Sequence, residues 1–336
     1  MELDLVRTFY QDMVLARRFE QAAAEQYTEG RIGGFLHLYP GEEAVAVGSL
    51  RAADPGDYVV SPYREHVHAL VRGIPPGQVM AELFGRRDGC SGGYGGSMHL
   101  FDPERRFLGG YAIVGETFPV AVGVGYWLAM RGEPDAVLCF FGDGAVNQGT
   151  FHESLNMAAL WRLPVLFVCE NNHYQIGTEI HRHSAVVEVH RRGCAHGIPG
   201  RRVDGMDVLA VYQATREALQ HLRQGLGPYL LECETYRFRG HSMADGAAYR
   251  SALEEAELRA RDPILLLRRR ILEEGWLEEA ELERLEAEAC EAVEEAVRLA
   301  EASPEPEDLH HGVYAHPLDP YRPPGDEGAE AEEDGR

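Results

Sequence analysis

The fold of this chain is decided by the stretch VLCFFGDG at residues 137–144. Five apolar residues lead there into a turn that carries an acid between two glycines. A second apolar run, VLFVC at residues 165–169, leads in the same way into Asn171 and Asn172. Short runs that are apolar throughout are typical of strands buried on both faces of a parallel sheet. The sequence therefore predicts an α/β fold built on a parallel sheet.

Polar residues follow both predicted strands at the point where each strand ends. Open parallel sheets bind ligands at the carboxyl ends of their strands, so we expect Asp143 and Asn172 to face one crevice. Carboxylate and amide oxygens are the ligands that Mg²⁺ prefers when it also holds a phosphate group. Gly144 has no side chain, which lets a phosphate approach the backbone closely. We therefore predict Asp143 and Asn172 as magnesium ligands.

Residues 145–164 are predicted to connect the two strands through a helix. Thr150 and Glu153 fit a capping box, and an apolar stripe runs from Phe151 to Ala159. Pro164 is expected to end the helix, and the free N–H groups near Gln148 are expected to favour an anion at the turn. A second helix is expected from Pro119 to about Met130, with Gly123 and Gly125 allowing close packing.

Composition excludes several classes of function. The 336 residues can form one large α/β domain or two small ones, and 55 acidic against 32 basic residues give a net charge of −23. Such a charge disfavours binding to nucleic acid or to an anionic membrane. Apolar runs are too short for a membrane span, and the N-terminus lacks the pattern of a signal peptide. A cytoplasmic protein is the natural expectation.

Cysteine and lysine usage narrow the chemistry further. The six cysteines form no CxxC pair, which disfavours structural zinc and a disulfide framework. All 32 basic residues are arginine. Without lysine the chain cannot form a Schiff base with pyridoxal phosphate or a substrate carbonyl, and it cannot be a P-loop protein or a protein kinase.

The region from residue 142 to residue 177 is far more specific than a GDG tripeptide alone, which is typical of ordinary turns. It resembles the diphosphate-binding motif of thiamine diphosphate enzymes, in which GDG, a spacer and NN follow one another. It is most similar to alpha subunits of the decarboxylating component of 2-oxo acid dehydrogenase complexes, the pyruvate branch above all. Further motifs of that family follow in its order at residues 9–27, 34–48, 61–66, 95–101, 111–125, 202–208 and 236–245, and faintly at 310–317.

The resemblance implies a fold and a reaction. It implies a transketolase-like diphosphate-binding α/β domain over residues 1–252 that includes an N-terminal helix, a helical extension over 253–322 and an acidic disordered tail over 323–336. The implied reaction is the oxidative decarboxylation of a 2-oxo acid, pyruvate first, with thiamine diphosphate and magnesium as cofactors. The acyl group, acetyl in that case, then passes by reductive acylation to a lipoyl group on the acyltransferase component.

The resemblance also implies ligands for the cofactor. The backbone carbonyl of Tyr174 is expected as a third metal ligand, and Gly144 and Ala145 as backbone contacts of the diphosphate. Tyr63 and Arg64 match a pair that reaches the phosphates, a task that suits the planar fork of arginine.

Two further motifs supply a ring contact and a candidate proton carrier. Val114 matches a position that holds the aminopyrimidine ring, although Ala112 departs from an expected glycine close by. His37 and His241 match site histidines, and His241 is the candidate for proton transfer near neutral pH. Other histidines are expected outside the site: His99 in a structural role, and at the surface His181, His183 and His190.

The chain lacks a second cofactor-binding domain, which implies a partner. In the family that this chain resembles, the glutamate that contacts the pyrimidine ring of the cofactor lies on another domain. We therefore expect an obligate beta subunit that carries this domain, in a heterotetramer of two alpha and two beta chains. A branched-chain 2-oxo acid dehydrogenase and an acetoin dehydrogenase remain open as alternatives. A binding pocket distinguishes substrates that differ by one methylene by only about 1–3 kcal/mol, which is too subtle to read from a sequence. A non-catalytic scaffold subunit is disfavoured by the intact site residues, namely Arg64, Asp143, Asn172 and His241.

Overall fold

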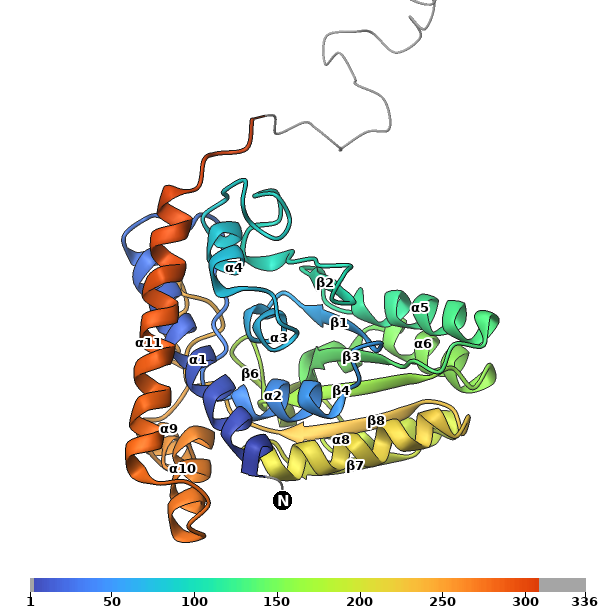
Figure 1. Ribbon diagram of the computed structural model, residues 1–336. Helices are drawn as coiled ribbons and strands as arrows, with labels where there is room; N and C mark the ends of the chain where they lie inside the picture. The colour runs from blue at the N-terminus through green and yellow to red at the C-terminus, as the bar shows by residue number, and fades with distance from the viewer. Residues whose placement is uncertain (1–2, 308–336) are drawn as a thin grey trace, which may run out of the picture.

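The computed structural model describes residues 3–307, and a six-stranded parallel sheet forms its centre (Figure 1). The strand order is β2-β1-β3-β4-β8-β7. The strands are β1 (Tyr58–Pro62), β2 (Phe107–Tyr111), β3 (Val137–Gly142), β4 (Val165–Asn171), β7 (Gly200–Asp204) and β8 (Tyr229–Glu234). A hairpin of β5 (Tyr174–Gln175) and β6 (Thr178–Glu179) follows β4 outside this sheet. The predicted parallel α/β fold is confirmed.

Helices cover both faces of the sheet, which explains why its strands are apolar throughout. Along β3, Leu138 and Phe140 enter one core, while Val137, Cys139 and Phe141 enter the other. The first core is shared with α1 (Leu3–Thr28), α2 (Glu43–Ala52) and α8 (Val208–Arg223). The second is shared with α5 (Thr117–Arg131), α6 (Gly149–Leu160) and the 3₁₀ helix η3 (Val189–His196). A strand buried on both faces has no side that needs polar residues.

Five further helices belong to the described part of the chain. They are α3 (His66–Val71), α4 (Pro76–Leu83), α9 (Ala252–Arg259), α10 (Pro263–Glu273) and α11 (Glu279–Ala302). The long α11 lies along α1 and α4 (Figure 1). Short helices are η1 (Gly96–Met98), η2 (Asp143–Asn147) and α7 (Ile180–His183). Among residues 3–307, no helix combines the length and the apolar character needed to cross a membrane.

Two expectations for the C-terminal region fall outside what the structure describes. The motif at 310–317 and the tail at 323–336 both lie beyond residue 307. The helical character expected from residue 253 onward is present as α9, α10 and α11 up to Ala302. The division of the chain into a domain and an extension stays a prediction.

The order of the strands reverses between β1 and β3. The chain leaves β1 towards β2 on one side and leaves β3 towards β4 on the other, although β1 and β3 are neighbours. Connections that depart in opposite directions leave a crevice at the carboxyl ends of the two strands. The residues that follow β1 and β3 therefore border the natural ligand site of this fold.

Local details of the connecting helices differ from the sequence prediction. The capping box at Thr150 is wrong: α6 begins at Gly149 with Gln148 as its N-cap, and the Thr150 hydroxyl donates instead to the carbonyl of Gly115 at 3.1 Å. The short helix η2 separates β3 from α6, so the first turn after Asp143 is 3₁₀. Helix α6 ends at Leu160, before Pro164, and α5 begins at Thr117, two residues before Pro119.

The two glycines of α5 give a matched test of packing. A Cβ atom at Gly125 would lie 2.6 Å from Cγ2 of Val165 in β4, whereas a Cβ at Gly123 meets nothing within 4 Å. Gly125→Ala is expected to destabilise the chain by about 1–3 kcal/mol through overpacking. Gly123→Ala is expected to stabilise it by about 0.5–1 kcal/mol, since alanine loses less entropy in a helix. Urea unfolding of the two variants measures both, and equal effects would contradict this account of helix–sheet packing.

Candidate active site

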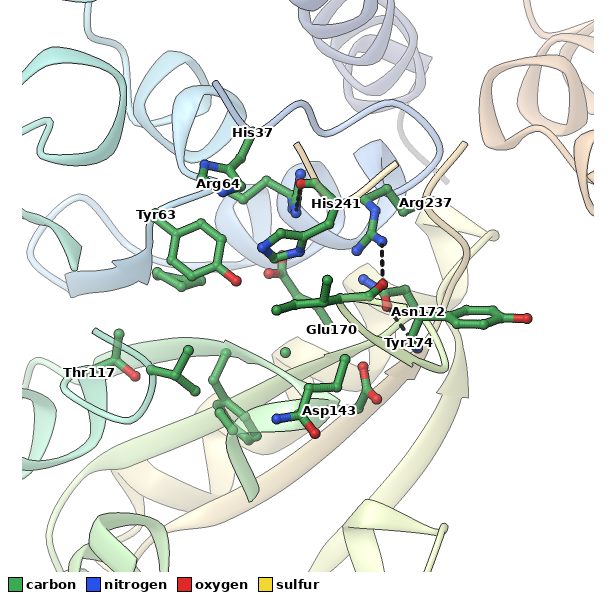
Figure 2. A pocket seen from close by; sticks show the side chains of 18 of the residues that line it. His37, Tyr63, Arg64, Thr117, Asp143, Glu170, Asn172, Tyr174, Arg237 and His241 are labelled. Carbon is green, nitrogen blue, oxygen red and sulfur yellow. Dashed lines mark hydrogen bonds between the residues drawn. The ribbon is translucent and has the colours of Figure 1, made fainter. Parts of the chain in front are cut away.

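One pocket opens at the strand reversal, and all ten predicted site residues line it (Figure 2). They come from loops that follow β1, β2, β3, β4 and β8, together with the segment before α2. The ten are His37, Tyr63, Arg64, Val114, Asp143, Gly144, Ala145, Asn172, Tyr174 and His241. The structure thus brings the whole predicted set together, and the roles of these residues towards a cofactor remain predictions.

Oxygen atoms gather on the side of the pocket formed by β3 and β4. Asp143 follows β3 directly, is 1% exposed, and its Oδ2 has no hydrogen-bond partner. The Asn172 Oδ1 accepts from the backbone N–H of Tyr174 at 3.2 Å. The neighbouring Asn171 instead donates to Glu232 at 2.7 Å, so its amide is engaged elsewhere. Of the asparagine pair, Asn172 lines the pocket.

The hairpin after β4 presents backbone to the pocket. The ring of Tyr174 points away from the cavity, and its hydroxyl donates to Glu254 of α9 at 2.7 Å (Figure 2). The backbone of Tyr174 is therefore the part that can contribute to the site. A Cβ atom at Gly144 would lie 2.7 Å from Cγ of Gln175. Glycine is thus required there for the hairpin to pack, quite apart from any ligand.

Two buried guanidinium groups lie across the pocket from Asp143 (Figure 2). Arg64 is 7% exposed and donates to the carbonyls of Leu38 and His241, the latter at 2.8 Å. Arg237 is 2% exposed and donates to the carbonyl of Arg239 at 3.1 Å. Burial, and then the charge of Arg237, lower the pKa of Arg64 from its ordinary value. Two cations buried this close favour an anion between them.

Three aromatic rings stand beside the arginines. The ring centroids of His37 and Tyr63 are 4.5 Å apart, and those of His37 and His241 are 5.0 Å apart. Burial, and then the charge of Arg64, lower the pKa of His37 to about 3 and that of His241 to about 4. Both imidazoles are therefore neutral at pH 7, and each has one ring nitrogen that can accept a hydrogen bond and one that can donate.

The segment that carries His241 is held by a single carboxylate. Asp245 accepts from the backbone N–H of His241 at 2.6 Å and of Ala247 at 2.9 Å, and from the hydroxyl of Tyr249 at 2.8 Å. Together with the bond from Arg64 to the His241 carbonyl, these contacts fix where the imidazole enters the pocket.

The donor set fits a diphosphate held by a divalent cation. The buried and unpartnered Asp143 Oδ2 and the Asn172 Oδ1 offer hard oxygen ligands of the kind that Mg²⁺ takes. The guanidinium groups of Arg64 and Arg237 offer planar donors suited to phosphate oxygens. The arrangement can therefore bind a phosphorylated cofactor through cation and arginines at once.

Sequence reasoning missed three charged residues that line the pocket, namely Glu42, Glu170 and Arg237. Arg237 lies shortly after the end of β8, so the rule applied to Asp143 would have found it. Glu170 is the first polar residue after the apolar run of β4, next to the asparagine pair. Glu42 precedes a helix, where acids are common for reasons of helix polarity. Burial raises the pKa of Glu42 to about 7.

The surface assignment of three histidines is partly wrong. His181 is exposed as expected, but His190 is half-buried and bonds to Glu232 at 2.7 Å. His183 has a side chain only 9% exposed, and its Nε2 lies 3.4 Å from Oδ2 of Asp143. The short helix α7 carries it there, and no periodicity in so short an element could have shown this. His99, expected to be structural, bonds to the carbonyl of Gly110 at 2.9 Å.

Comparison with known proteins gives one family. A family model described as "Dehydrogenase E1 component" matches residues 11–308. A protein of Porphyra purpurea named pyruvate dehydrogenase E1 component subunit alpha is 48% identical over 88% of this chain and 88% of its own length. One of the same name from Rhizobium meliloti is 48% identical over 89% and 86%. An Arabidopsis thaliana protein named as the chloroplastic subunit alpha-3 is 48% identical over 92% and 74%.

The lowered pKa of His241 predicts a pH dependence of stability. The pKa is 6.5 for a free imidazole and about 4 in the folded chain, so the unfolded chain binds a proton first as the pH falls. The stability due to neutral His241 is therefore lost between these two values. His241→Asn is expected to lose less stability than wild type between pH 7 and pH 5 in thermal unfolding. The exposed His181→Asn serves as control and should keep the wild-type slope.

Proposed function

Because the chain belongs to the dehydrogenase E1 component family, we propose that it is the alpha subunit of a pyruvate dehydrogenase that uses thiamine diphosphate and Mg²⁺. The observation that supports this most is the convergence of ten motif residues on one pocket. These residues are far apart in the sequence, and a subunit with a merely structural role has no need for buried arginines and a carboxylate oxygen without a hydrogen-bond partner in a cavity.

The residues divide the work of holding the cofactor. Asp143, Asn172 and the carbonyl of Tyr174 hold Mg²⁺, while Arg64, Arg237 and the backbone of Gly144 and Ala145 hold the diphosphate oxygens. Thiamine diphosphate, when bound, supplies a ring that accepts the electron pair left by departing carbon dioxide. Val114 supports the pyrimidine ring, and Tyr63 packs beside the two histidines.

His241 is the proton carrier of this proposal. Its imidazole is neutral at pH 7, so a ring nitrogen can take up a proton from the reacting substrate and return it. Arg64 would hold an anionic group of the cofactor or substrate beside this imidazole, and it is too buried to be screened by water.

Pyruvate is the proposed substrate because the similar proteins of three organisms carry that substrate in their names. Branched-chain 2-oxo acids and acetoin are the alternative substrates, since enzymes that act on any of the three use the same cofactor site. The expected cytoplasmic location stays a prediction, as one similar protein is named as chloroplastic.

We propose that a beta subunit covers the outer side of α5 and α6. Large apolar side chains are exposed there, among them Met130 and Leu160 at 70% each. The patch consists of Tyr126, Trp127, Met130, Met157, Leu160 and Trp161, at the C-terminal ends of α5 and α6. A patch of this kind on a single chain marks an interface. We propose that the beta subunit binds there in a heterotetramer of two alpha and two beta chains that serves a lipoyl-bearing acyltransferase.

Loss of a metal ligand tests the cofactor site. Asp143→Ala and Asn172→Ala are each expected to weaken Mg²⁺-dependent thiamine diphosphate binding by more than about 100-fold, since even outer partners of a metal ligand contribute about 10–100-fold. Asn171→Ala is the matched control and should keep the wild-type affinity, although it loses its bond to Glu232. Calorimetric titration of the co-expressed alpha–beta complex measures all three.

The same complexes test the reaction. Wild type should reduce an artificial electron acceptor with pyruvate faster than with 3-methyl-2-oxobutanoate or acetoin, and Asp143→Ala should do so with none of them. Faster turnover of another substrate would replace pyruvate in the proposal. Wild-type binding by Asp143→Ala would refute the assignment of the metal site.

Charge placed in the apolar patch tests the partner surface. Leu160→Glu is expected to prevent the alpha–beta complex from forming, because an interface core does not tolerate an unpaired charge. Leu265→Glu on α10 is the control, since Leu265 is also an exposed leucine, at 59%, but lies outside the patch. Size-exclusion chromatography of co-expressed chains reports the assembly. Unchanged assembly by Leu160→Glu would place the beta subunit elsewhere.

A further inference from the structure

We propose that Glu42 is a positioning residue of the metal site, and that it acts by holding the side-chain amide of Asn172 with its oxygen towards the cation. This inference rests on the proposed function, because it concerns the ligand Asn172. Glu42 belongs to none of the ligand groups considered so far, yet it is 1% exposed and lines the same pocket.

The amide of Asn172 is fixed at both of its ends. Its Nδ2 donates to Oε1 of Glu42 at 3.0 Å, and its Oδ1 accepts from the backbone N–H of Tyr174 at 3.2 Å. An amide flipped by 180° would place two donors together at Tyr174 and two acceptors together at Glu42. A flipped amide would also offer N–H groups to a cation. Glu42 therefore selects the one orientation in which Asn172 can be a metal ligand.

Backbone geometry brings Glu42 to this position. Gly41 has a φ of +106°, and a Cβ atom there would lie 2.1 Å from the carbonyl oxygen of Tyr236, so only glycine lets the chain pass this close to the end of β8. The next residue is directed into the pocket as a result. Glu43, by contrast, bonds to Arg17 and to the N–H of Gly41, and it takes no part in the pocket.

The other contacts of the Glu42 side chain are weak, so holding the amide of Asn172 is its main role. Its side chain does not cap α2, although Glu42 occupies the N-cap position. Its Oε2 has no hydrogen-bond partner, and the nearest cationic group recorded for it is Nε of Arg64 at 4.0 Å. A carboxylate next to a diphosphate repels it, and Arg64 at 4.0 Å is a weak reason for an acid here, so a more specific one is needed. The bond to Asn172 gives one.

Binding of Mn²⁺ in place of Mg²⁺ tests the proposal without reference to turnover. Electron paramagnetic resonance would measure free Mn²⁺ in the alpha–beta complex with thiamine diphosphate present. Glu42→Ala is expected to raise the Kd for Mn²⁺ by about 10–100-fold, the usual effect of losing an outer partner of a ligand. Glu42→Gln keeps an oxygen acceptor and should stay near wild type. Glu43→Gln is the matched control and should lower thermal stability with an unchanged Kd.

Exchange of acid and amide gives a second test that does not depend on an alanine variant that folds. Asn172→Asp sets two carboxylates against each other and should bind Mn²⁺ more weakly than wild type. The double variant Glu42→Gln/Asn172→Asp restores one hydrogen bond with donor and acceptor reversed, and it should recover most of the affinity. A side chain that merely fills space would give no such recovery.

The outcomes separate this inference from the function on which it rests. If wild type binds Mn²⁺ and thiamine diphosphate but Glu42→Ala binds equally well, the positioning role is overturned and the proposed function stands. Absence of recovery in the double variant would likewise overturn it. If wild type binds no thiamine diphosphate with any divalent cation, both are overturned.

Discussion

The reversal of strand order between β1 and β3 is the constraint on which the rest of the structure depends. In a wholly parallel sheet the carboxyl ends of all strands lie along the same edge. The reversal of strand order leaves a crevice at one place along that edge. Arg64 and Asp143 enter the pocket because they follow the two strands that border the opening, not because they are near each other in the chain. The layers of helices on both faces keep the strands apolar, so polar chemistry is confined to the ends.

The pocket combines opposite charges without neutralising them. Arg64 and Arg237 lie on one side, and Asp143 lies on the other, with Asn172 and the hairpin backbone between them. A diphosphate with its cation has the same division, since anionic oxygens face the arginines and the metal faces the acid. Arginine suits the buried positions, because its guanidinium keeps its charge where an ammonium group loses it. The absence of lysine therefore does not weaken the binding of an anion at this site.

Much of the fold and of the site was predictable from the sequence, because both depend on short-range patterns. Apolar runs ending in polar residues located β3, β4 and the crevice, and the spacing of motifs identified the family. What could not be predicted depended on distant partners. The hydroxyl of Thr150 bonds to Gly115 rather than to its own helix, and His183 reaches Asp143 from a four-residue helix. Glu42 acts on a residue 130 positions away, and no local pattern records such a contact.

The hydrogen bond from the Tyr174 hydroxyl to Glu254 joins the β5–β6 hairpin beside the pocket to helix α9. Tyr174 lines the pocket, and its side chain bonds to α9, so the two regions are coupled through one residue. Such coupling is reciprocal: whatever stabilises the hairpin from the pocket also stabilises the docking of α9, by the same free energy. Amide hydrogens in α9 should therefore exchange more slowly with deuterium when the site is filled, although the helix contributes nothing to the lining of the pocket.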